Sequence, residues 1–295
     1  MKSRLSLKNL ARAALNNLFV LLLICSGCSS STKPTYLKEN TVRAVEDICK
    51  NEYSIDVKVK RVGSTLWIYL PVKDIFVESQ KPEKYIERFK IEQNKDKFEA
   101  GVLKLEYLIN VIAENEKEQL YKFDKKIAKQ INDVWSALRR VLFSMDRSKE
   151  NQPRFFCFVI TDINKGFEIR QIFYNLDMKK ISYGLISWGE YQHRTIQDIE
   201  LIIEAIGDKE GRYLAYKDIT MDDFISGQIQ HRIKLKFQKP EVDSNADIDK
   251  EIMKIAVRVI KTYAFNDFRG LELVNLLTKN KTVLSQAAVL ARPIE

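Results

Sequence analysis

The chain is poor in the residues on which most catalytic and metal sites depend. Its 295 residues include two histidines, four cysteines and ten glycines. It contains no Gly-x-Ser-x-Gly elbow, no His-Glu-x-x-His and no glycine-rich phosphate loop. Each motif belongs to one type of catalytic site: the serine nucleophile of α/β-hydrolases, the zinc site of metalloproteases, or a nucleotide phosphate site. The sequence therefore shows no sign of these enzyme classes.

The two histidines occupy matching positions in a short repeated frame. The segment from Gly189 to Arg194 reads GEYQHR, and the segment from Gly227 to Arg232 reads GQIQHR. His193 and His231 could meet as metal ligands, since neutral imidazole binds many metals. Their spacing matches no metal-ligand signature, and coincidence or a similar local structure explains the repeated frame equally well. We therefore expect no metal site and no cofactor.

Positive charge is in excess but is not clustered. The chain has 49 Lys and Arg against 40 Asp and Glu, a formal net charge of +9. We find no basic block of the kind that nucleic-acid binding needs, so no nucleic-acid partner is expected. The acidic pairs Asp222-Asp223 and Asp247/Asp249 fall at predicted helix starts, where acids suit the helix dipole. We therefore expect helix-terminal roles for them and name no catalytic residue.

The first 27 residues have the composition of a secretory signal. An apolar run from Leu18 to Cys25 precedes the small pair Ser26-Gly27, and no acidic residue occurs before Cys28. The four basic residues of this segment are Lys2, Arg4, Lys8 and Arg12. Because a membrane-spanning helix needs roughly 20 apolar residues, we expect residues 1–27 to be removed. An ordinary cleaved signal with Cys28 left free, or an uncleaved anchor, is the alternative.

The residues at this junction resemble the lipobox of bacterial lipoproteins, in which an aliphatic residue, a small residue, and Gly or Ala precede the acylated cysteine. Here these positions are Cys25, Ser26, Gly27 and Cys28, with Cys25 where leucine is usual. The resemblance implies cleavage before Cys28 and lipid on its sulfur and new amino terminus. Ser29, in place of Asp, implies export to the periplasmic face of the outer membrane in a diderm host.

Residues 28–40 are expected to form a flexible tether. The stretch from Ser29 to Thr35 is small and polar and contains Pro34, so it cannot bury enough apolar surface to order itself. The folded body is therefore expected to begin near residue 41. The whole chain has 45% hydrophobic residues, and a body of this length can bury a core large enough to be globular.

A helix followed by a hairpin recurs three times in the body. Apolar spacing predicts helices over 42–49, 127–145 and 248–263, and alternation predicts the hairpins 55–70, 155–174 and 271–289. Gly166 suits the positive φ of the second turn. A strand pair with one apolar face needs a helix to cover it, so we predict an α+β fold with one or two antiparallel sheets covered by helices.

The segments between these units are less regular. Residues 87–92 and 98–112 are predicted to pair around Asn94-Lys95-Asp96, followed by a charged connector at 114–118. The connector favours a boundary between an N-terminal region, 41–118, and a larger region, 119–295.

A capped helix is predicted from Thr195 to Gly207. The Thr hydroxyl can cap the first free amides, and Gly suits the left-handed stop. After this helix we expect a strand over 212–219, a short helical turn over 220–226 and a strand over 228–237.

Cys49 and Cys157 remain beside Cys28 once the signal is removed. Export would place them in an oxidising compartment, where a disulfide could tie the first unit to the second. Such a bridge would contribute on the order of 4–5 kcal/mol. The alternative is a pair of buried thiols that act as small apolar residues.

The segment 183–194 is the least ordinary part of the body. It combines aromatic residues, two glycines and an arginine ahead of the predicted helix. Aromatics supply rigid contact area and Arg supplies directed donors, which suits a sugar, peptide or protein ligand. The alternative is a loop whose Trp188 and Tyr191 fill the core. The candidate binding residues are Tyr183, Trp188, Tyr191, His193 and Arg194.

These features predict a lipid-anchored protein of the bacterial cell envelope. We expect a non-catalytic binding or assembly component, held at a membrane through Cys28, whose partner is an envelope protein or a wall polymer. An envelope hydrolase acting on wall polymer or carbohydrate, and a solute-binding lipoprotein, are the alternatives.

Overall fold

The structure is a computed structural model, and it describes residues 40–144, 152–238 and 242–293. The expected signal peptide 1–27, the lipid site Cys28 and the expected tether as far as residue 39 lie outside the described residues. Residues Thr41–Glu295 form one compact unit. Of the helices described in it, none combines the length and apolarity needed to cross a membrane.

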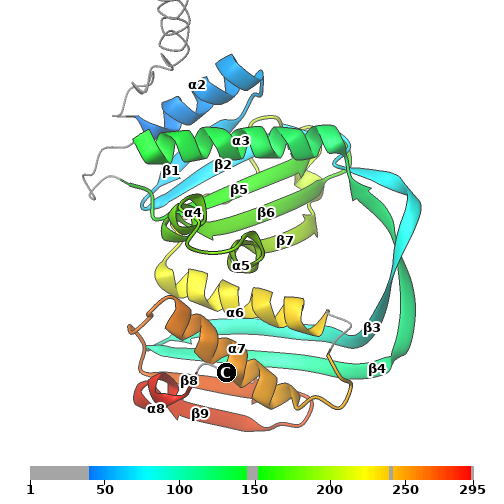
Figure 1. The fold of residues 1–295 in the computed structure, drawn as a ribbon, viewed down its shortest axis with the longest axis vertical. Coiled ribbons are helices and arrows are strands. Elements are labelled where there is room, and N and C mark those ends of the chain that lie inside the picture. Colours follow the sequence, from blue (N-terminus) through cyan, green and yellow to red (C-terminus); the bar gives the residue numbers. More distant parts are fainter. Residues whose placement is uncertain (1–39, 145–151, 239–241, 294–295) are drawn as a thin grey trace, which may run out of the picture. The chain divides into compact units, whose positions relative to one another are not determined.

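Two mixed β-sheets and their covering helices make up this unit (Figure 1). The first sheet has the order β1-β2-β5-β6-β7, with strands Lys58–Val62, Thr65–Val72, Phe155–Asp162, Phe167–Tyr174 and Ile196–Leu201. The second has the order β3-β4-β8-β9, with strands Phe76–Glu99, Val102–Phe123, Gly270–Asn275 and Lys281–Ser285. The helices are α2 (Thr41–Tyr53), α3 (Lys125–Ser144), α4 (Asn175–Ser182), α5 (Trp188–Arg194), the 3₁₀ turn η2 (Ile203–Ala205), α6 (Met221–Phe237), α7 (Ile248–Thr262) and α8 (Gln286–Ala291).

The three predicted helix-hairpin units are present, and the α+β class is confirmed. α2 precedes the β1-β2 hairpin, α3 precedes β5-β6, and α7 precedes β8-β9. The expectation of purely antiparallel sheets is only partly right. The β1-β2 hairpin joins the β5-β6 hairpin through the parallel pair β2-β5. The β8-β9 hairpin joins the β3-β4 hairpin through the parallel pair β4-β8.

The central strands β2 and β5 are covered on both faces. On one face, Leu66 and Phe156 lie close to Val45 of α2 and Leu138 of α3. On the other face, Cys157 belongs to a separate cluster that includes residues of the 207–220 loop and of α6. Burial on both faces explains why these strands are near-continuous apolar runs.

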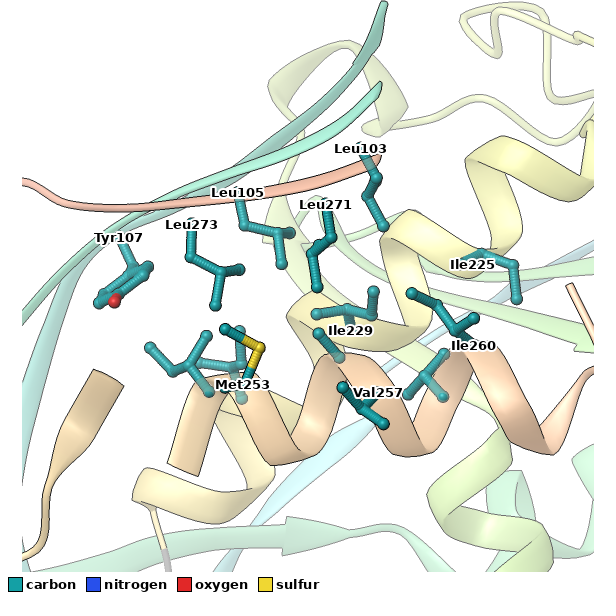
Figure 2. Packing of buried hydrophobic residues seen from close by; sticks show 14 of the residues in the cluster. Leu103, Leu105, Tyr107, Ile225, Ile229, Met253, Val257, Ile260, Leu271 and Leu273 are labelled. Atoms are coloured by element: carbon teal, nitrogen blue, oxygen red, sulfur yellow. The ribbon is translucent and has the colours of Figure 1, made fainter. Parts of the chain in front are cut away.

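A second core fills the space between the four-stranded sheet and two helices (Figure 2). Its strands contribute Leu103, Leu105, Tyr107, Leu271 and Leu273, which point toward Ile225 and Ile229 of α6 and Met253, Val257 and Ile260 of α7. α6 serves both cores, because Phe224 packs in the cluster against the five-stranded sheet. This helix therefore couples the two sheets.

The predicted strand over 228–237 is wrong, because α6 continues through it to Phe237. Ile229, Ile233 and Phe237 are spaced by four, which places them on one face of a helix and, because four is even, on one face of a strand as well. The start of the helix is as expected. The Thr220 side chain and the Asp223 side chain form a reciprocal capping box.

The predicted helix from Thr195 to Gly207 is also wrong. Residues Ile196–Leu201 form β7, which pairs antiparallel with β6 at the edge of the sheet, and η2 follows. Thr195 ends α5 instead of starting a helix, since its backbone N–H and its hydroxyl both donate to the Tyr191 carbonyl. Pairing with β6 outweighs the helical spacing of the isoleucines.

The predicted strand over 212–219 is a loop lying on the sheet. The Trp67 indole donates to the Lys217 carbonyl at 2.8 Å, and the Ile219 amide donates to the Thr65 hydroxyl at 2.7 Å. Side-chain and backbone contacts to β2 therefore satisfy groups that a strand would pair with a neighbouring strand.

β3 and β4 form a much longer hairpin than expected. Its turn lies at Ala100 and Gly101, both with positive φ, and not at 94–96. The charged stretch 114–118 is part of β4, where cross-strand pairs such as Arg88 with Glu114, at 2.7 Å, face solvent. The expected boundary between 118 and 119 falls inside this strand. The regions 41–118 and 119–295 also share both sheets.

Near the end of the chain, the predicted β8-β9 hairpin is present but its second strand ends at Ser285. The Ser285 side chain accepts from the Ala288 amide and begins α8. The residues up to Val289, expected in the strand, are therefore partly helical.

Cys49 and Cys157 are free and buried. α2 carries Cys49 and covers the face of the sheet that presents Leu66, whereas Cys157 belongs to the cluster on the opposite face. The sheet separates the two sulfur atoms, so the possible disulfide is not formed and the alternative of two buried thiols holds. Burial raises the pKa of each thiol to about 12.

Candidate functional site

A cleft of about 930 Å³ opens beside the edge strand β7. It is bounded by α3, α4, α5 and α6, and its floor comes from β6 and β7. Its volume is within the range of small-molecule sites, roughly 300–1,000 Å³. The cleft contains three of the five residues named from sequence, namely Trp188, Tyr191 and His193.

Aromatic side chains form one wall of the cleft. Trp135 of α3 packs on Phe173 with ring centroids 4.1 Å apart and meets Tyr191 at 6.0 Å. Trp188 lies 5.7 Å from Tyr191 at an interplanar angle of 35°. Tyr191 is buried, whereas Trp188 is 62% exposed. Tyr191 thus packs against both Trp135 and the solvent-exposed Trp188.

Two glutamine side chains lie at the floor of the cleft. Gln171 of β6 and Gln197 of β7 are cross-strand partners, and their side-chain amides are joined by a 2.9 Å hydrogen bond. Further amides, from Asn132, Gln192 and Gln238, line the walls. Each amide can donate and accept, so the cleft can satisfy a ligand that carries many hydroxyl groups.

Charge in the cleft is sparse and largely cationic. Arg139 and Lys234 are among its lining residues, and Asp198 is the one carboxylate among those described there. Lys234 Nζ lies 2.6 Å from Asp198 Oδ1, so this carboxylate already has a partner. A pair of facing acids, as glycoside hydrolysis requires, is therefore not found among the described residues that line the cleft.

α5 is held in place by an ionic network behind the cleft. Ser187 caps the helix by accepting from the Glu190 amide. Arg194 lies 2.8 Å from Asp177 of α4 and 2.8 Å from Glu190, and Arg232 of α6 approaches Glu190 at 3.3 Å. Burial opposes ionisation of Glu190, but the bonds from Arg194 and the charge of Arg232 lower its pKa. Arg194, expected to bind ligand, thus fixes the helix that carries Trp188.

The two histidines lie in the same cleft. Burial lowers the pKa of His231 to about 4, and Lys234, Arg232 and His193 add to this effect while Asp198 opposes it. The imidazole is therefore neutral near pH 7, and its Nδ1 accepts from the backbone N–H of Gln197 at 3.5 Å. His231 thus joins α6 to the free edge of β7.

A metal site is not found in the part of the chain that the structure describes, where no three side chains of His, Cys, Asp or Glu gather to hold an ion. The acidic pairs serve other roles. Asp223 belongs to the α6 capping box, and Asp247 caps α7. Asp249 accepts hydrogen bonds from Tyr107 and Asn275.

Sequence reasoning located one wall of the cleft and missed the others. Tyr183 is exposed and does not line it. Trp135 carried a helical periodicity that indicated a core position, and the amides of β6 and β7 carried no signal of their own. These residues come together in the cleft only because β7 pairs with β6 and α6 packs against β7.

No protein-family model, no curated protein and no solved structure matches this chain significantly.

Proposed function

We propose that this protein is a lipid-anchored component of the bacterial cell envelope that binds a wall glycan without catalysing a reaction on it. Lipid on Cys28 holds the body within tether reach of a membrane, at the periplasmic face of the outer membrane in a diderm host. Tethering raises the effective concentration of the body near an envelope ligand. Several acyl chains give stable attachment, whereas one chain alone binds only marginally.

The composition of the cleft is the observation that carries the binding proposal. An exposed Trp188 backed by Tyr191 offers a flat apolar surface, and the amides of Gln171 and Gln197 offer donors and acceptors at the floor. A sugar ring has apolar C–H faces and a rim of hydroxyl groups. Aromatic surface and side-chain amides match both parts of that chemistry.

A hydrolase is the weaker candidate. General acid and base catalysis on a glycosidic bond uses two carboxyl groups about 5–10 Å apart. The described lining of the cleft supplies Asp198, which is paired with Lys234. The geometry therefore supports retention of a glycan more than its cleavage.

Removing the exposed ring should weaken ligand binding. We expect Trp188→Ala to raise the Kd for soluble peptidoglycan fragments, prepared by muramidase digestion, by about tenfold to a hundredfold, because an aromatic anchor of this kind contributes about 1.4–2.8 kcal/mol. Isothermal titration calorimetry with the purified full chain measures the change.

Tyr183→Ala is the matched control. Tyr183 is an aromatic of the same segment with similar exposure, but it lies outside the cleft. Its Kd should equal that of the wild type. Equal binding by the two variants, or no binding of any fragment by the wild type, would refute the glycan assignment.

A further inference from the structure

An exposed apolar patch lies outside the cleft, at the last turn of α3 and around α4. We call it the α4 patch, and it consists of Phe143, Leu176, Tyr183 and Leu185. Phe143 and Tyr183 meet edge to face with centroids 5.6 Å apart. Tyr183 and Leu185 are 69% and 71% exposed. Single exposed apolar residues are ordinary, but adjacent aromatic and aliphatic side chains indicate a contact surface.

Backbone hydrogen bonds at the end of α4 present these side chains together. The Tyr183 amide donates to the Lys179 carbonyl, and the Leu185 amide donates to the Lys180 carbonyl at 2.8 Å. Gly184 between them has φ +69°, so the chain turns back over the last helical turn. Leu185 is thereby held beside the helix end in an ordered turn.

Among the described residues of the two helices that form the patch, the charges near it are mainly positive. Lys179, Lys180 and Arg139 come from the two helices that form it. Lys179 Nζ lies 2.7 Å from the Gln152 side-chain oxygen, and Lys180 Nζ lies 4.0 Å from Asp177. The Asp177 side chain is 1% exposed, so it presents almost no negative charge to a partner. Exposed aromatic and aliphatic side chains on helices that also carry cations suit the headgroup region of an anionic bilayer.

The folded body also begins near the same end of α3. Thr41, the first residue of α2, lies close to Leu138, Leu142 and Pro153, and Leu142 directly precedes Phe143 in the last turn of α3. The chain between Cys28 and Thr41 can span at most about 45 Å when fully extended. A lipid on Cys28 would therefore keep the α4 patch within reach of the membrane that holds the lipid.

We infer that the α4 patch rests on the anionic phospholipid surface to which the lipid anchors the protein. This inference depends on the proposed lipid at Cys28. The patch would act as a second, weaker membrane contact that restricts how the body turns on its tether, and with it the direction in which the neighbouring cleft opens.

A fluorescent probe at the patch tests the inference. The mature lipidated chain carrying Leu185→Cys is labelled with an environment-sensitive dye and reconstituted into vesicles of phosphatidylethanolamine and phosphatidylglycerol. Cys49 and Cys157 are buried with raised pKa values, so they should not compete for the dye near pH 7.5. Val283→Cys, at an exposed position of β9, is the control.

We expect the dye at position 185 to shift to shorter wavelength and to be quenched at least twofold by spin-labelled lipids, while the dye at position 283 is not. If the dyes at positions 185 and 283 show the same wavelength and the same quenching in a chain whose lipid is verified by mass, the membrane contact of the α4 patch is refuted. The proposed lipid anchor is then unaffected. Equal quenching in neutral phosphatidylcholine would overturn the anionic assignment. A wild-type chain without lipid would overturn the proposed function, and the inference with it.

Discussion

Replacing Arg194 with alanine is expected to destabilise the protein by about 3–5 kcal/mol, because it leaves the buried Asp177 carboxylate without its closest cation. Arg194 Nη1 lies 2.8 Å from Asp177, and the remaining cation, Lys180, is 4.0 Å away. The change also leaves Glu190 with Arg232 alone, at 3.3 Å, and removes the ion pair between α4 and α5. Urea unfolding of the variant and the wild type measures the difference.

A double-variant cycle separates the charge effect from lost packing. Adding Asp177→Asn to Arg194→Ala should recover part of the lost stability, because the uncompensated charge is then gone. Lys180→Ala, which removes the distant and half-exposed cation, should change stability by less than about 0.5 kcal/mol. A loss below about 1 kcal/mol for Arg194→Ala would show that the network does not hold α5.

Acid should destabilise the wild type through His231. Its pKa is lowered to about 4 in the folded protein and is near 6.5 in an unfolded chain. Between these two values the unfolded chain binds a proton that the folded protein does not, so stability falls as the pH falls through this window. The full effect is on the order of 3 kcal/mol at pH 4, and it vanishes above about pH 7.

His231→Gln provides the comparison, because glutamine can still accept from the Gln197 amide but does not titrate. The free energy of unfolding of the wild type, measured against that of the variant from pH 7 to pH 4, should fall steadily. Parallel curves for the two proteins would mean that His231 is not held neutral in the fold.

The parts of the fold that depend on local pattern could be predicted from the sequence. The helix over 248–262 has a stripe of apolar residues on one side, and the Gly166 turn joins two strands next to each other in the chain. Both features need information from only a few neighbouring residues. The three helix-hairpin units were predicted for this reason.

Elements whose character depends on distant partners could not be predicted. Ile196 and Ile199 satisfy helical spacing, but pairing with Ile172 and Ile169 of β6 makes them a strand. α6 is buried on more than one side, so it shows no single apolar stripe and its second half looked like alternation. The sequence carries no local signal for either contact.

The candidate site divides in the same way. Trp188, Tyr191 and His193 lie within one short segment of unusual composition, so their grouping was visible. The rest of the lining includes Trp135 on α3 and His231 on α6, which are distant from this segment in the sequence. Only the packing of both helices at the sheet edge brings them beside it.

Intact mass spectrometry of the protein purified from a bacterial membrane fraction, compared with Cys28→Ala, tests the lipid-anchored binding proposal most directly. The account predicts a wild-type mass equal to a chain that begins at Cys28 plus several acyl chains, and loss of that added mass and of membrane retention in the variant. An unacylated wild-type chain in the soluble fraction would contradict it.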